Sequence, residues 1–150
     1  MSSFAYTEPV RLAQIGVGYW GRNLLRNAAA MPGTNVVAVC DTDPRALDAA
    51  RRLAPEARLS SDLDLVLSDA SIEAVIVATE TPTHAEIAAR ALEAGKHVFV
   101  EKPLAQSVED AERLVALAEA HDRRLMVGHL LRYHPAYRHV EDLVARGGLG

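Results

Sequence analysis

The feature that most constrains the fold is a glycine-rich turn between an apolar run and a helical pattern. Residues 12–15 lead directly into Gly16, Gly18 and Gly21, which form a Gly-x-Gly-x-x-Gly motif. In a strand–turn–helix unit the first glycine allows the tight turn, the second lets a phosphate approach the backbone, and the third lets the helix lie close to the strand. The free N–H groups and the positive dipole end of such a helix favour the pyrophosphate of a dinucleotide. We expect the helix to place four apolar side chains on one face: Trp20, Leu24, Ala28 and Met31.

An acidic residue supports the dinucleotide interpretation. The next apolar run, residues 36–40, ends at Asp41, about 20 residues after the last glycine of the motif. At this offset a carboxylate accepts hydrogen bonds from the ribose diol of a dinucleotide. The negative charge repels a 2′-phosphate, so Asp41 favours NAD over NADP; Asp43 adds to this repulsion and Arg45 partly offsets it. The alternative is that Asp41 is only a turn residue before a helix.

Strand and helix patterns alternate along the chain. Residues 74–78 are apolar at every position, as in a central parallel strand that is covered on both faces. The alternation predicts an α/β fold with a right-handed, doubly wound parallel sheet: a Rossmann fold of strand order 3-2-1-4-5-6, with a ligand crevice at the carboxyl ends of the first and fourth strands. We expect strands at residues 10–15, 35–40, 57–59, 74–78, 97–100 and 125–127, and helices at 19–31, 44–54, 62–67, 81–94, 107–120 and 135–146.

The segment after the fourth strand lies beside the glycine turn in this topology. The hydroxyl groups of Thr79 and Thr81, and the helix start at Pro82, could line the phosphate and ribose side of a cofactor. The segment is equally explained as a plain loop in which Thr81 caps the helix. His84 is expected to be neutral, because the dipole of a helix start disfavours an imidazolium. Its side chain either contacts ribose or faces the solvent.

The triplet Glu101-Lys102-Pro103 follows the fifth strand, next to the predicted nicotinamide position. Removal of hydride from a carbinol carbon requires the hydroxyl proton to leave, and a desolvated lysine can hydrogen-bond that oxygen and accept the proton. Only two of the 16 basic residues are lysines, Lys96 and Lys102. Lys102 is therefore the candidate catalytic residue; the alternative is a solvated loop charge. The sequence does not decide whether the bond before Pro103 is cis.

Further polar residues follow the sixth strand. His129, Arg132 and Tyr133 are expected at the same sheet edge as Lys102, where they could meet the nicotinamide amide, a sugar hydroxyl or a phosphate. The alternative is a polar connection into the last helix.

Composition excludes several other classes of protein. The net charge of −4 without a basic cluster argues against nucleic-acid binding. The longest apolar runs have about five residues, whereas a membrane span needs roughly 20. Residues 1–9 have neither a basic start nor a long apolar segment, so we expect a flexible leader, no signal peptide and a cytoplasmic location. Cys40 is the only cysteine and is expected in the core, and no cysteine–histidine cluster has the spacing of a zinc site.

Four stretches of the chain together resemble one family of oxidoreductases. They are Ile15-Gly16-Val17-Gly18-Tyr19-Trp20-Gly21, Val39-Cys40-Asp41, Thr81-Pro82-Thr83-His84 and Ala94-Gly95-Lys96-His97-Val98-Phe99-Val100-Glu101-Lys102-Pro103. These stretches resemble the glucose–fructose oxidoreductase/inositol dehydrogenase/rhizopine-catabolism (Gfo/Idh/MocA) family over nearly all of residues 10–150. The stretch that ends in Glu-Lys-Pro is the most specific of the four.

The resemblance implies NAD or NADP as cofactor and a sugar, polyol or nucleotide sugar as substrate. It places Lys102 close to the reacting carbon, and it matches Arg132 to an arginine often found after the sixth strand. The cofactor-binding residues that follow from the motifs and the resemblance are Gly16, Gly18, Tyr19, Trp20, Gly21, Asp41, Thr79, Thr81, Pro82, His84, Glu101, Lys102 and Arg132.

Members of this family continue into a second α/β domain that supplies most of the substrate pocket and usually the oligomer interface. We expect residues 10–150 to be the dinucleotide-binding half of such a homo-oligomeric enzyme, without that substrate domain and not active alone. The alternatives are a non-catalytic dinucleotide-binding module that acts as a sensor or partner subunit, and an S-adenosylmethionine-binding domain, which the Glu-Lys-Pro segment disfavours.

Overall fold

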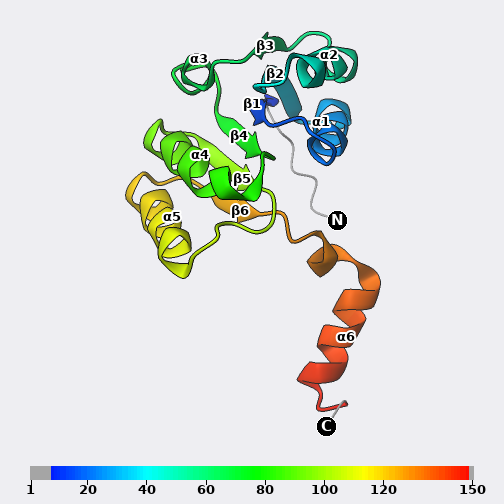
Figure 1. Cartoon of the computed structure of the whole chain (residues 1–150). Coiled ribbons are helices and arrows are strands. Elements are labelled where there is room, and N and C mark those ends of the chain that lie inside the picture. Colours follow the sequence, from blue (N-terminus) through cyan, green and yellow to red (C-terminus); the bar gives the residue numbers. More distant parts are fainter. Residues whose placement is uncertain (1–7, 149–150) are drawn as a thin grey trace.

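A six-stranded sheet organises the chain (Figure 1). The computed structural model describes residues 8–148. The strand order is β3-β2-β1-β4-β5-β6, and all five neighbouring pairs are parallel. The predicted Rossmann topology is therefore confirmed. The leader predicted over residues 1–9 lies outside the described residues except for the exposed residues 8 and 9.

Most predicted elements lie within one residue of their predicted bounds. The strands are β1 Val10–Ile15, β2 Thr34–Cys40, β3 Arg58–Ser60, β4 Ala74–Val77, β5 His97–Val100 and β6 Leu125–Val127. The helices are α1 Gly21–Ala30, α2 Pro44–Leu53, α3 Leu63–Leu67, α4 Thr81–Glu93, α5 Val108–Ala120 and α6 Pro135–Ala145, with a short 3₁₀ helix, η1, at Leu130–Tyr133.

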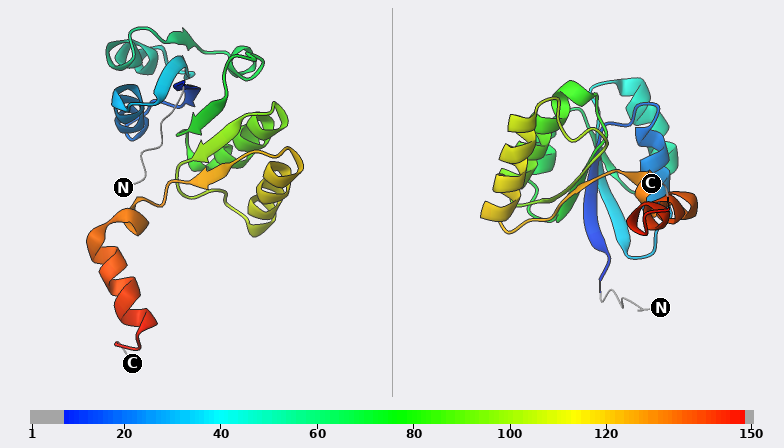
Figure 2. Two further views of the ribbon diagram at one scale, coloured as in Figure 1. Left: turned by 180° about the vertical axis from the view of Figure 1, so that it is seen from behind. Right: turned by 90° about the horizontal axis from the view of Figure 1, so that it is seen from below.

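Helices cover both faces of the sheet. Seen from below, α1 and α2 lie on one side and α4 and α5 on the other (Figure 2). Each face has its own apolar cluster: Leu25 of α1 and Ala50 of α2 pack in one, and Leu92 of α4 and Leu114 of α5 pack in the other. In β4, alternate residues serve the two clusters, which is why this strand reads as a continuous apolar run.

Strand β4 lies in the middle of the sheet, between β1 and β5. Val75 and Val77 are buried under α4 and α5, while Ala74 and Ile76 pack against the opposite cluster. The prediction of a central strand at this position is confirmed.

The apolar face predicted for the first helix was right at Ala28, which is buried, and wrong at Trp20 and Met31. The residues that α1 buries are Gly21, Leu25 and Ala28, whereas Trp20 and Met31 are 46% and 54% exposed. The helix begins at Gly21, one residue after Trp20, and the missing side chain of Gly21 lets this stripe approach the turn. Trp20 therefore lies outside the buried face of α1.

Helices α2 and α5 have the side-chain caps that their sequences favour, and α4 does not. Asp43 and Ser107 cap α2 and α5 through side-chain bonds to Arg45 N–H and Asp110 N–H. Thr81, however, is the first residue of α4 and not its cap. Glu80 holds the cap position with extended backbone and no side-chain cap bond.

Helix α6 extends away from the sheet (Figure 1), and none of its side chains is buried. The site at the carboxyl edge of the sheet is therefore built from the elements up to β6.

Candidate functional site

The three glycines of the turn meet three different steric requirements. Gly16 has a φ of 88°, and a Cβ there would lie 2.5 Å from Ala78 O. A Cβ on Gly21 would lie 2.5 Å from Gly16 O, so the start of α1 rests directly on the turn. A Cβ on Gly18 would meet no atom within 4 Å. The turn is therefore packed tightly against the loop after β4 and the start of α1, and it is open at Gly18, as the motif predicts.

The open side of the turn presents backbone donors. Within residues 8–148, the N–H groups of Gly18, Tyr19 and Trp20 have no hydrogen-bond acceptor. They precede α1, so the positive end of its dipole adds to their attraction for an anion. This arrangement suits a phosphate group.

Asp41 lies at the end of β2 and is bonded to the turn. Val17 N–H donates to Asp41 Oδ2 at 2.7 Å, and Asp43 N–H donates to Oδ1 at 2.9 Å. Each carboxylate oxygen can accept a further hydrogen bond. The backbone bonds hold the carboxylate in place, where it could receive the two hydroxyl groups of a ribose.

A groove of about 680 Å³ joins these features at the carboxyl edge of the sheet. Six of the predicted site residues line it: Gly16, Gly18, Tyr19, Trp20, Asp41 and Thr79. The sequence did not single out four other lining residues: Thr42, Ser61, Leu63 and Ile87. Periodicity does not show which partly buried helix residues, such as Leu63 and Ile87, border an opening.

The remaining predicted residues lie outside this groove. They are Gly21, Thr81, Pro82, His84, Glu101, Lys102 and Arg132.

His84 is buried at 1% exposure, so the solvent-facing alternative was wrong. Its Nδ1 lies 2.8 Å from Pro103 O and its Nε2 lies 3.1 Å from Thr79 O. The imidazole therefore joins the loop after β4 to the loop after β5 from beneath. The structure gives it a supporting place, because both ring nitrogens face carbonyl groups of the protein.

Glu101 is also buried, at the end of β5. Its Oε1 accepts from Trp20 Nε1–H at 2.8 Å, and its Oε2 accepts from Lys102 N–H at 3.1 Å. A Cβ on Gly128 would lie 3.1 Å from Glu101 Oε1, so only glycine fits at the end of β6 without movement. Glu101 thus fixes the indole of Trp20 against the end of β5.

Lys102 is exposed, and its peptide bond to Pro103 is cis. The described residues therefore do not supply the desolvation that was expected around the Lys102 ammonium. Lys102 is the second residue after β5 and does not line the groove, and its place beside a nicotinamide ring stays a prediction.

Arg132 lies on η1, where it is exposed and forms an ion pair with Glu141 of α6 at 3.4 Å. It borders a separate depression with His129 and Tyr133. The structure does not bring this segment to the glycine turn, because η1 leads away from the sheet edge.

Cys40 lines the groove but is almost fully buried. Burial, with the negative charges of Asp41 and Asp62, raises the pKa of its thiol to about 11. This supports the prediction of a core residue over a reactive thiol.

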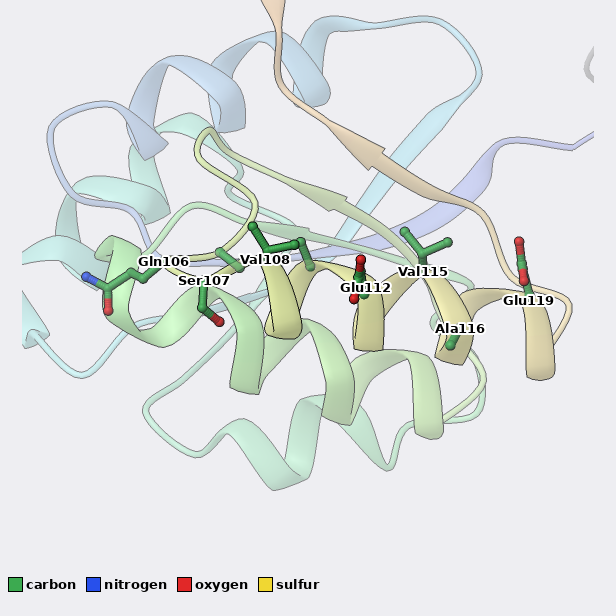
Figure 3. A pocket seen from close by; sticks show the side chains of 9 residues that line it. Gln106, Ser107, Val108, Glu112, Val115, Ala116 and Glu119 are labelled. Carbon is green, nitrogen blue, oxygen red and sulfur yellow. The ribbon is translucent and has the colours of Figure 1, made fainter.

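A second depression, on the outer face of α5, has a different character (Figure 3). Val108 and Val115 line it together with Glu112 and Glu119. Its two carboxylates would repel phosphates. The groove at the glycine turn is therefore the better dinucleotide site.

Residues 8–148 contain no group of three or more histidine, cysteine, aspartate or glutamate side chains that could hold a metal ion. None of their helices is both long and apolar enough to cross a membrane.

Several curated relatives of the chain are inositol dehydrogenases. Inositol 2-dehydrogenase 3 of Saccharopolyspora erythraea is 41% identical over 144 residues, covering 94% of this chain and 42% of the relative. An inositol 2-dehydrogenase of Acidothermus cellulolyticus is 38% identical over 149 residues, covering 97% of this chain and 43% of the relative. The chain thus spans about two fifths of the length of these relatives.

Solved structures agree with this relationship. The scyllo-inositol dehydrogenase of Lactobacillus casei with bound NAD(H) and scyllo-inositol superposes with a TM-score of 0.86 at 27% identity, covering 95% of this chain and 43% of that one. A 3-ketoreductase from Actinomadura kijaniata, in complex with NADP and TDP-benzene, also has a TM-score of 0.86, at 30% identity, covering 95% and 44%. Residues 10–129 match the family described as "Oxidoreductase family, NAD-binding Rossmann fold", GFO_IDH_MocA. The chain therefore belongs to the Gfo/Idh/MocA oxidoreductase family, of which it carries the NAD-binding Rossmann fold.

Proposed function

We propose that this chain binds NAD in the groove at the glycine turn and forms the cofactor half of a dehydrogenase that acts on a polyol or sugar. The observation that carries the proposal is that the open turn at Gly18 and the fixed carboxylate of Asp41 line one groove. In a dinucleotide-binding fold, the backbone of a glycine-rich turn holds the phosphates, and an acidic residue about 20 residues later accepts hydrogen bonds from the ribose.

The residues present fit a dinucleotide. The N–H groups of Gly18, Tyr19 and Trp20 would hold the pyrophosphate, and Asp41 would accept from the adenosine ribose. Leu63 and Ile87 offer apolar surface on the far wall of the groove, suited to the adenine ring. The charge of Asp41 supports NAD as the preferred cofactor over NADP.

Lys102 is the proposed catalytic residue. When bound, the nicotinamide ring supplies the acceptor or donor of hydride. Lys102 Nζ would hydrogen-bond the carbinol oxygen of the substrate and take up its proton. Its exposure, and the fraction of the relatives' length that the chain spans, support a second domain that covers this lysine and completes the substrate site.

The substrate class rests on the relatives. Inositol dehydrogenases support a cyclic polyol, and the 3-ketoreductase supports a nucleotide sugar as the second choice. Family membership is also the support for proposing a homo-oligomer and a cytoplasmic location for the whole protein.

Calorimetric titration with NAD⁺ tests the proposal. The wild-type chain should bind saturably, and Gly18→Val should weaken binding more than about tenfold, or roughly 1.4 kcal/mol. The valine side chain would project into open space above the turn, so folding should be preserved while the phosphate position is blocked. Ala29→Val, an exposed change on α1 away from the turn, is the matched control and should bind as the wild type does. Equal affinities of wild type and Gly18→Val would place the cofactor elsewhere.

A further inference from the structure

Gln14 is a fully buried polar residue near the carboxyl end of β1, and no motif of the sequence includes it. It lies on the face of the sheet that α1 covers, two residues after Leu12, which packs in the cluster beneath α1 and α2. An uncharged polar side chain at such a position costs free energy unless it is hydrogen-bonded. Its contacts therefore show what it does.

The side-chain amide of Gln14 bonds to both ends of the glycine turn. Nε2 donates to Gly16 O at 2.9 Å and to Gly21 O at 2.6 Å. These are the first and the last glycine of the motif. A Cβ on Gly21 would lie 3.3 Å from the same nitrogen, so the amide, the turn and the start of α1 meet at one point.

The orientation of the amide follows from its partners. Both neighbours are carbonyl oxygens, so the nitrogen must face them, since an amide oxygen in its place would repel both. This leaves Gln14 Oε1 buried without a hydrogen-bond partner within the described residues. The unpaired oxygen is the consequence of directing the amide nitrogen at the two carbonyl groups of the turn.

Gly16 O has no other hydrogen-bond donor among the described residues. Without Gln14, one end of the turn would lose its bond to the strand below, and the spacing between Gly16 and Gly21 would be free to relax. The N–H groups of Gly18 and Tyr19 lie on the backbone between these two points, so their directions depend on that spacing.

We infer that Gln14 is a positioning residue for cofactor binding: its amide sets the width of the glycine turn from beneath and so aligns the N–H groups that receive the pyrophosphate. It touches no ligand and acts only through the turn. The inference rests on the proposed function, because it concerns the same cofactor groove.

Gln14→Met tests the inference. Methionine keeps the length of the side chain and removes both the two donors and the unpaired oxygen, so the thermal unfolding midpoint should stay within about 5 °C of wild type. Affinity for NAD⁺ should nevertheless fall about tenfold, as measured by calorimetry on the folded chain. Leu12→Met is the matched control, on the same strand and face but away from the turn, and it should retain wild-type affinity.

A measurement on the wild-type chain covers the case in which Gln14→Met does not fold. In ¹H–¹⁵N spectra the side-chain NH₂ of Gln14 should be protected from solvent exchange, and its resonances should shift when NAD⁺ binds.

The outcomes separate the two proposals. If the wild-type chain binds no cofactor, the proposed function fails. If it binds NAD⁺ and Gln14→Met binds equally well, only the role of Gln14 fails. Rapid exchange of the Gln14 side-chain NH₂, or resonances that NAD⁺ does not move, would also overturn that role.

Discussion

At the scale of single residues, the site depends on backbone geometry that particular side chains permit or fix. Gly16 and Gly21 are required by contacts of 2.5 Å that a Cβ would make, whereas a Cβ on Gly18 would meet no atom within 4 Å, and we propose that a phosphate takes that space. Asp41 belongs with them, because its two oxygens accept from the backbone of the glycine turn and of the loop after β2.

The charge of Asp41 should determine which dinucleotide binds. Asp41→Asn keeps the size of the side chain and removes the charge that would repel a 2′-phosphate. The ratio of NAD⁺ to NADP⁺ affinity, measured by calorimetry with both cofactors, should fall about tenfold. An unchanged ratio would show that the carboxylate does not face the ribose.

The positions of these residues were predictable because local backbone rules specify them at fixed spacing. The contacts of Gln14 and His84 were not, because their partners are backbone carbonyls that leave no trace in the sequence. Lys102 is an intermediate case: its position was predictable, but its exposure depends on what surrounds it.

At the scale of elements, a buried lysine ties the loops at the opposite edge of the sheet. Lys96 lies between α4 and β5, and its Nζ donates to Asp69 O at 2.7 Å and to Ile72 O at 2.8 Å. Burial lowers the pKa of the Lys96 ammonium, and the nearby Asp69 opposes this effect. The lysine thus holds the connection between α3 and β4 against the start of β5.

Lys96→Met should therefore destabilise the fold and leave the cofactor site intact. The change removes two charge-assisted hydrogen bonds and leaves two carbonyl groups without them, at a cost of about 2–4 kcal/mol in the free energy of unfolding. Urea unfolding measures this loss, and NAD⁺ titration of the folded variant should give wild-type affinity. A loss of affinity without a loss of stability would contradict the structural role.

The same connection should make stability sensitive to acid. Hydrogen bonds from the Ser71 hydroxyl and backbone N–H, at 2.7 and 2.9 Å, and then the Arg58 guanidinium, lower the pKa of Asp69 from 3.8 to about 2. A carboxyl group whose pKa is lowered in the folded state contributes stability above its ordinary pKa and loses it as pH falls through the folded value. Between about pH 4 and pH 2, wild type should therefore lose stability more steeply than Asp69→Asn. Parallel curves in urea unfolding would refute this.

Element positions were predictable to within about one residue, because apolar runs, proline and capping residues mark the ends. The two errors, the buried face of α1 and the cap of α4, have tertiary causes. In α1 the close approach of Gly21 to the turn decides which residues are buried, and in α4 the loop after β4 places Glu80 at the cap.

At the scale of the whole molecule, parallel strand order brings the turn after β1, the end of β2 and the loop after β4 to one sheet edge. The sequence predicted this convergence from topology alone. It could not show that the segment at Arg132 leaves that edge, because no pattern within η1 or α6 specifies the direction in which they leave the sheet (Figure 2).

The most direct test of the account is to locate NAD⁺ on the chain by ¹H–¹⁵N chemical-shift mapping. Addition of NAD⁺ to the labelled wild-type chain should shift the backbone amides of Gly16, Gly18, Tyr19 and Asp41, and should leave those of α5 around Val115 unchanged. A folded chain that shows no shifts with millimolar NAD⁺ or NADP⁺, or whose shifts gather at α5, would contradict the central claim that the glycine turn and Asp41 together bind the cofactor.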